Sequence, residues 1–335
     1  MSLVPITIVS GFLGAGKTSL LSHLLQANHG KKLAVLVNDF GKLNIDSEII
    51  VEIEGETVSL TNGCICCTIR DDMLTEVLNL LSKNNPPEHI IIETSGVSDP
   101  TLVAHTFQMP AVQGLVEVDS IISVVDADQV LTLTDDFKDL AHRQMRIADL
   151  LVINKVDLVN AERVESVRKL VRSITPMARV VESVLGRVDV KLLLSLDRFD
   201  STNLQEMADE NVNTRFETWA YSSDKPFTFL AIRKVMEEIP ASIYRMKGFI
   251  LLEGAPEEQG QFQMTGGRSW LRLGTAWESK TRLTRLVFIG SLGLDKEEIN
   301  EVLDRCQKVY SRRELDKRNE PVIVENHQAL TVLFG

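Results

Sequence analysis

Gly11-Phe12-Leu13-Gly14-Ala15-Gly16-Lys17-Thr18 decides the fold of this 335-residue chain. The stretch follows the short apolar run Ile6–Val9 and opens a segment with helical periodicity, Lys17–Ala27. A turn of this G-x-x-x-x-G-K-T pattern between a buried strand and a helix lets backbone N–H groups surround phosphate oxygens. The helix N-terminus adds the positive end of its dipole. The sequence therefore predicts a phosphate-binding loop at the end of the first strand of an α/β domain.

Residues 1–196 alternate between short apolar runs and helical patterns. Helical spacing is clearest in Lys17–Ala27, Ile69–Leu81 and Val164–Val171. Runs that are typical of buried strands are Ile6–Val9, Leu33–Val37, Thr57–Leu60, His89–Ile92, Ile121–Val125, Leu150–Ile153 and Val180–Val181. Apolar strands separated by helices predict a parallel sheet that is flanked by helices, with ligands at the carboxyl ends of the strands.

This pattern ends near Leu196. The mostly polar segment 197–213 is predicted to be a linker. For residues 214–335 we expect a smaller α+β domain. Its predicted strands and helices are Phe216–Tyr221, Thr228–Glu238 (helix), Met246–Leu252, Gln261–Met264, Ser269–Leu273, Arg285–Ile289 and Asp295–Cys306 (helix).

Composition narrows the functional classes. The hydrophobic fraction is 44% and the charged fraction 25%, which is ordinary for a globular protein. The formal net charge of −11 gives no electrostatic reason to bind nucleic acid or an anionic membrane. No stretch approaches the roughly 20 apolar residues of a membrane span, and no signal peptide is recognised. Four cysteines are too few for a disulfide scaffold, so we expect a reducing, cytoplasmic location.

The phosphate site is expected to draw residues from two strand ends. Lys17 can reach the β- and γ-phosphates, and the Thr18 hydroxyl can ligate Mg²⁺. Glu93 ends a strand, where an acid commonly holds Mg²⁺ directly or through water, and Gly96 can offer its N–H to the γ-phosphate. The remaining residues predicted to bind the nucleotide phosphates are Gly11, Gly14, Ala15, Gly16 and Ser19.

Asn154-Lys155-Val156-Asp157 follows another predicted strand and matches Asn-Lys-x-Asp. The Asp157 carboxylate can accept hydrogen bonds from both N1–H and the 2-amino group of guanine. Adenine offers neither donor and would leave a charged acceptor unpaired, at a cost of about 1–3 kcal/mol or more. The motif therefore favours GTP over ATP, and Ser183, after the last strand, is predicted to lie under the base. Asp39, also after a strand, is a candidate to orient the attacking water.

Three cysteines, Cys64, Cys66 and Cys67, lie between a predicted strand and a predicted helix. Thiolates bind Zn²⁺ or Co²⁺, and three protein ligands leave an open coordination position that suits a transferable ion. The alternatives are three buried cysteines that act as small hydrophobes, and a redox switch. The neighbouring Asn62 and Gly63 favour the metal. Cys306 stands alone in a predicted helix and is expected to be a core residue.

Together, the motifs at 11–18, 63–67, 93–96 and 154–157 resemble the CobW-type metallochaperone GTPases. Arg245–Gly248 and Leu286–Gly290 resemble marks of that family's C-terminal domain. The resemblance implies a GTPase that uses GTP and Mg²⁺, binds Zn²⁺ or Co²⁺ at its cysteines, and delivers the ion to a client protein or cofactor pathway. Val37 and Lys42 stand where some relatives carry glutamates, so it implies no accessory metal site there.

Two other functions fit parts of the pattern. One is a regulatory GTPase with a structural zinc, and the other is a P-loop kinase that acts on a small molecule. The Asn-Lys-x-Asp motif speaks against the kinase. The sequence identifies neither the client nor an oligomeric state.

Overall fold

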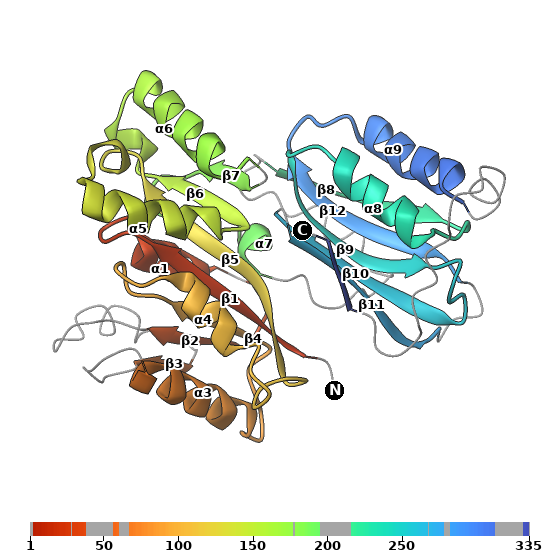
Figure 1. Ribbon diagram of the computed structural model, residues 1–335, viewed down its shortest axis with the longest axis horizontal. Coiled ribbons are helices and arrows are strands. Elements are labelled where there is room, and N and C mark those ends of the chain that lie inside the picture. The colour runs from red at the N-terminus through yellow and green to blue at the C-terminus, as the bar shows by residue number, and fades with distance from the viewer. Residues whose placement is uncertain are drawn as a thin grey trace. The chain divides into compact units, whose positions relative to one another are not determined.

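The computed structural model divides into two compact units, Met1–Ser195 and Leu196–Gly335 (Figure 1). It describes residues 3–27, 29–37, 56–59, 67–176, 178–194, 216–266, 268–277, 282–311 and 331–334. The predicted linker, 197–213, lies outside the described residues, so the predicted domain boundaries stay a prediction.

The first unit contains a seven-stranded sheet in the order β3-β2-β4-β1-β5-β6-β7, in which every neighbouring pair is parallel. Its strands are β1 (Val4–Gly11), β2 (Leu33–Val37), β3 (Glu56–Ser59), β4 (His89–Glu93), β5 (Val116–Asp126), β6 (Leu150–Asn154) and β7 (Arg179–Glu182). The central strand β1 lies between β4 and β5, so the loop that follows it is placed in the middle of the carboxyl edge. The predicted α/β fold is confirmed.

The helices of this unit are α1 (Lys17–Gln26), α3 (Cys67–Leu81), α4 (Pro100–Thr106), α5 (Asp135–Arg146), α6 (Ala161–Ile174) and α7 (Val190–Leu193), with 3-10 turns at Val130–Thr132 and Val156–Leu158. Ile6, Ile8 and Ile92 pack with residues of α3 and α4 in one apolar cluster. Val125 and Ile153 pack with residues of α5 and α6 in a second cluster. Thr7 alternates with Ile6 and Ile8 along β1, and its hydroxyl donates to the Leu193 carbonyl of α7. Side chains therefore leave β1 toward helices on both faces of the sheet.

The sequence prediction of the helices needs correction in two respects. Helix α3 begins at Cys67, two residues before the predicted start, so the third cysteine of the cluster is the first residue of the helix. Helices α4 and α5 were absent from the sequence prediction. The buried face of α5 includes Ala141, Gln144 and Met145, which do not form a continuous apolar stripe.

The second unit contains a six-stranded antiparallel sheet in the order β13-β11-β10-β9-β12-β8. Its elements are β8 (Phe216–Ser223), α8 (Phe229–Glu238), β9 (Ile243–Leu251), β10 (Glu258–Thr265), β11 (Arg268–Ala276), β12 (Thr284–Ser291), α9 (Lys296–Val309) and β13 (Thr331–Phe334). The predicted α+β class is confirmed. Cys306 is 1% exposed among the apolar residues between the helices and the sheet, as expected of a core residue.

Among the described residues, no helix combines the length and the hydropathy that crossing a membrane requires.

Candidate functional site

The phosphate loop occupies the predicted place between the end of β1 at Gly11 and the start of α1 at Lys17. Gly16 immediately precedes the helix with φ of 100°, a left-handed conformation that only glycine adopts without strain. A Cβ at this position would also collide with the side chain of Asn154. The loop can therefore lie against β6 only if residue 16 is glycine.

Lys17 turns back over the loop that precedes it. Its side chain is 8% exposed, and its Nζ donates to the carbonyls of Gly11 at 3.0 Å and Phe12 at 3.4 Å. The ammonium group is thus held inside the ring of backbone that the motif predicts to bind phosphate. A phosphate oxygen would give it a charge-assisted bond, which is stronger than its bonds to neutral carbonyls.

Thr18, the second residue of α1, lies against Glu93, the last residue of β4. The Thr18 hydroxyl donates to Glu93 Oε1 at 3.3 Å, and Glu93 is 6% exposed. This contact follows from the sheet register, because Val9 of β1 is paired with Glu93 of β4. The arrangement brings together a hydroxyl and a carboxylate, the hard oxygen ligands that Mg²⁺ prefers.

Gly96, in the loop after β4, packs against the backbone of Leu13 in the phosphate loop. A Cβ on Gly96 would stand 2.6 Å from the backbone nitrogen of Leu13, so the loop after β4 can approach this closely only with glycine there. The same loop is held by Gln144 of α5, whose Nε2 donates to the carbonyls of Gly96 at 3.1 Å and Ser98 at 3.0 Å.

Asn154 connects the phosphate loop with the loop that follows β7. Its Nδ2 donates to the Ala15 carbonyl at 2.9 Å, and its Oδ1 accepts from the Gly186 N–H at 3.0 Å. Asn154 is 1% exposed, so both bonds are shielded from water.

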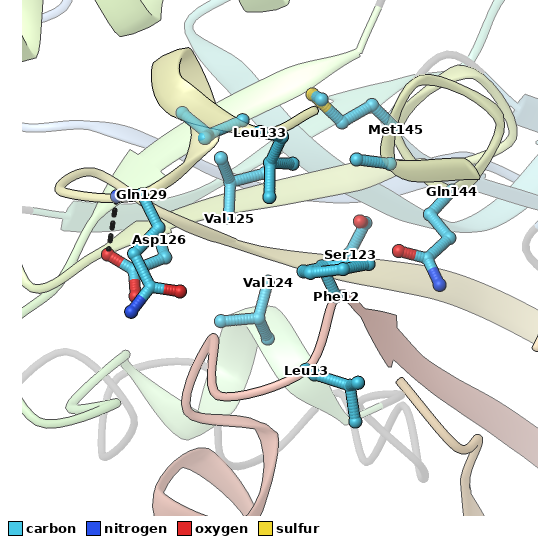
Figure 2. A pocket seen from close by; sticks show the side chains of 12 residues that line it. Phe12, Leu13, Ser123, Val124, Val125, Asp126, Gln129, Leu133, Gln144 and Met145 are labelled. Carbon is cyan, nitrogen blue, oxygen red and sulfur yellow. Dashed lines mark hydrogen bonds between the residues drawn. The ribbon is translucent and has the colours of Figure 1, made fainter. Parts of the chain in front are cut away.

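Lys155 and Asp126 form an ion pair of 2.7 Å beside this connection. Lys155 has φ of 61°. Asp126 is fixed in turn, because its Oδ1 accepts from the backbone N–H of Asp128. The same oxygen accepts from the backbone N–H of Gln129 (Figure 2). Asp157 lies in the 3-10 turn that follows and is exposed, as a residue that meets a base from solution must be. Ser183 is 2% exposed, and its hydroxyl donates to the Arg187 carbonyl at 3.3 Å.

The structure adds Asp126, Gln144 and Gly186 to the predicted residues of the site. Asp126 ends strand β5, and an acid at a strand end was the same signal that singled out Glu93. Gly186 stands in a loop after the last strand, where a glycine that approaches other backbone is common. Gln144 carries no sequence signal, because a single glutamine in a polar helix has no pattern.

Two residues of the candidate thiophilic site, Cys64 and Cys66, lie outside the described residues, while the backbone of Cys67 is described as the start of α3. Asp39, the candidate to orient the attacking water, also lies outside the described residues. In the part of the chain that the structure describes, no group of three or more His, Cys, Asp or Glu side chains could hold a metal ion.

Residues 5–182 match the nucleotide-binding domain of the CobW/HypB/UreG family, and residues 216–307 match the C-terminal domain of the cobalamin synthesis protein CobW. The chain belongs to the CobW/HypB/UreG family. This membership confirms both the resemblance seen in the sequence and the predicted class of enzyme, a P-loop GTPase.

Individual relatives cover most of the chain. It is 31% identical over 343 residues to the zinc chaperone CobW of Sinorhizobium sp, an alignment that covers 90% of this chain and 96% of that protein. It is 32% identical over 315 residues to zinc-regulated GTPase metalloprotein activator 1 of Dictyostelium discoideum, covering 78% of this chain and 66% of that protein. The crystal structure of the Zn(II)-bound YjiA GTPase from E. coli superposes with a TM-score of 0.46 at 23% identity, covering 91% of this chain and 99% of that one.

Proposed function

We propose that this CobW-family GTPase is a metallochaperone that binds Zn²⁺, or Co²⁺, at Cys64, Cys66 and Cys67 and delivers it to a client protein or cofactor pathway. One observation carries the proposal: Cys-x-Cys-Cys runs directly into helix α3 of the same domain that holds the phosphate loop. The similarity to a zinc chaperone and to a zinc-regulated GTPase metalloprotein activator supports it. The client and the cytoplasmic location stay predictions.

The chemistry of the cysteine cluster suits a cargo ion. A helix N-terminus stabilises thiolates, and Cys67 is the first residue of α3. Three thiolates fill three of the four positions that Zn²⁺ usually takes, so the fourth stays available to a ligand from the client. A closed structural site would use all four positions.

The nucleotide side of the proposal assigns a role to each predicted residue. Lys17 binds the β- and γ-phosphates, the Gly96 N–H meets the γ-phosphate, and Asp157 reads the guanine base. Asp39 orients the attacking water. Asn154 and Lys155 support the site through their bonds to Ala15 and Asp126.

The oxygen atoms of Thr18 and Glu93 fit Mg²⁺, because the hydroxyl oxygen and a carboxylate oxygen lie 3.3 Å apart. These two residues would hold the ion, Glu93 directly or through water. When bound, Mg²⁺ neutralises charge on the β- and γ-phosphates.

Coupling between nucleotide and cargo is favoured by the sheet order. Strands β2 and β4 are neighbours, with Val37 paired to Glu93, so the segments that begin after them start from the same edge of the sheet. The first of these segments contains Asp39, and the second contains Gly96. The cysteines stand between them in the sequence, so we propose that ordering of both segments by GTP changes the affinity for the metal.

Calorimetry of Zn²⁺ binding tests this coupling. We expect the dissociation constants for Zn²⁺ with a non-hydrolysable GTP analogue and with GDP to differ by about 5–150-fold, a typical range for coupled sites. Equal affinities would contradict the coupling and favour a regulatory GTPase with a structural zinc. Cys66→Ser should weaken Zn²⁺ binding, whereas Cys306→Ser, in the core of the other unit, should leave it unchanged.

A further inference from the structure

Gln144 of α5 is a buried polar residue that the GTPase motifs leave unexplained. It is 1% exposed and uses both hydrogens of its amide nitrogen, one toward the Gly96 carbonyl and one toward the Ser98 carbonyl. Carbonyl groups only accept hydrogen bonds, so the nitrogen and not the oxygen of the amide must face them. The orientation of the side chain is therefore fixed by the loop that it binds.

The loop that Gln144 binds is the tight turn that connects β4 to α4. The Thr94 N–H donates to the Val9 carbonyl at 2.9 Å, and the Ser98 N–H donates to the Ser95 carbonyl at 2.9 Å. The backbone of Gly96 packs on Leu13. Gln144 thus supports, from the helix side, a turn whose opposite side lies against the loop that binds phosphate.

The oxygen of the same amide points into a cavity. Ser123 and Gln144 both line a cavity of about 20 Å³, together with apolar residues that include Phe12, Leu13 and Met145 (Figure 2). Neither Ser123 Oγ nor Gln144 Oε1 has a hydrogen-bond partner in the part of the chain that the structure describes, and both residues are 1% exposed. A cavity that exceeds about 10–15 Å³ and offers polar groups can hold one water molecule.

A buried glutamine is costly at such a place. An unpaired buried polar atom costs about 1–3 kcal/mol, and a methionine of similar length would fill the apolar surroundings without that cost. The two hydrogen bonds to the turn offset this cost, because an apolar side chain could not donate to the carbonyls of Gly96 and Ser98.

We propose that Gln144 is a positioning residue for GTP hydrolysis, which holds the Gly96–Ser98 turn so that the Gly96 N–H is presented to the γ-phosphate. A single buried water between Gln144 Oε1 and Ser123 Oγ completes the hydrogen bonding of the amide. The inference rests on the role proposed above for Gly96, and it is independent of zinc delivery.

Gln144→Met tests the role of the amide. We expect kcat for GTP to fall by about 10–100-fold, in the range that displaced groups cost in active sites, because the turn is no longer fixed. The dissociation constant for GDP should stay within about twofold, because GDP lacks the γ-phosphate that Gly96 meets. Hydrolysis is measured without zinc, so failure of the metallochaperone proposal appears separately, in the zinc calorimetry.

Three further variants separate positioning from packing. Gln144→Glu keeps the size and polarity of the side chain but cannot donate as a carboxylate, so its kcat should fall too, even if Gln144→Met does not fold. Ser123→Ala alters the same cavity and keeps the two hydrogen bonds that Gln144 Nε2 donates. Arg143→Ala removes the half-exposed side chain next to Gln144 in the sequence, whose Nε lies 3.6 Å from Asp99 Oδ2. Both should keep kcat within about twofold. The proposal is overturned if the Gln144 variants keep the wild-type kcat, or if their affinity for GDP falls by the same factor as their kcat. It is also overturned if Ser123→Ala lowers kcat as much as the Gln144 variants do.

Discussion

The side chain of Asn154 ties the carbonyl of Ala15 to the N–H of Gly186, with bonds of 2.9 Å and 3.0 Å. One buried amide therefore links the phosphate loop to the loop after β7. We expect Asn154→Ala to leave both backbone groups unpaired, at a cost of about 1–3 kcal/mol for each. Affinity for GDP should fall about tenfold or more, since about 1.4 kcal/mol corresponds to a factor of ten. Calorimetric titration with GDP measures the loss.

A matched control is available on the same unit. Asn160 caps helix α6 on the surface, where its Oδ1 accepts from the Arg163 N–H at 2.9 Å. Asn160→Ala should lower the free energy of unfolding by about 0.5–2 kcal/mol and leave GDP affinity unchanged. If Asn154→Ala lowers stability in the same way but binds GDP as tightly as wild type, the link does not serve the nucleotide site.

Asp157 is expected to set the choice of base. In Asp157→Asn, the amide nitrogen faces the 2-amino group of guanine, and two donors then oppose each other. Xanthine carries a carbonyl at that position, so the variant should bind xanthosine triphosphate more tightly than GTP. Competition binding with the two nucleotides measures the reversal. Asp128→Asn, the same change on the exposed loop after β5, should keep the preference for GTP; a preference unaltered by Asp157→Asn would contradict the role of Asp157.

The parallel sheet could be predicted because its strands are continuous apolar runs. Leu33–Val37 is the clearest case, since all five residues are buried and the predicted and observed bounds coincide. Helix α5 could not be predicted in this way. Its inward face combines Ala141, Gln144 and Met145, and only the finished sheet and turn show what each of them contacts.

Some residues of the candidate site could likewise be predicted and others could not. Lys17, Glu93 and Asn154 belong to sequence motifs, and the sheet brings them together because β1, β4 and β6 end at one edge. Gln144 binds backbone carbonyls, which every residue possesses, so no sequence pattern at positions 96 and 98 points to it. A side chain that binds backbone carbonyls of a distant segment can be identified only when the path of the backbone is known.

Glu217 should give the second unit a stability that depends on pH. Burial raises the pKa of its carboxyl, but hydrogen bonds from Lys296 and from the N–H groups of Leu294 and Gly293 outweigh this and hold the pKa below its ordinary value of 4.5. A lowered folded-state pKa stabilises the fold above the unfolded-state value, and this contribution is lost as the pH falls through the folded-state pKa. Glu217→Gln should therefore lower the Tm at pH 7, and this difference should shrink as the pH falls below 4.5 and through the folded-state pKa.

Thermal unfolding of the two proteins across this pH range measures the effect. Glu301→Gln, an exposed change on helix α9, is the control and should shift the Tm little at either pH. A Tm difference between Glu217→Gln and wild type that stays constant from pH 7 to pH 3 would show that the carboxylate charge contributes nothing.

The four cysteines should divide into two classes of reactivity. Burial, followed by the nearby charge of Glu238, raises the pKa of the Cys306 thiol to about 11, so almost none of it is thiolate near neutral pH. We expect an aromatic disulfide reagent to titrate three thiols in the metal-free native protein and the fourth only after denaturation. One equivalent of Zn²⁺ should protect those three, whereas Cys306→Ser should keep the native count of three. A thiolate that is bound to the metal is a poor nucleophile. If the three thiols react with the disulfide reagent as fast in the presence of Zn²⁺ as in its absence, the cluster is excluded as the cargo site.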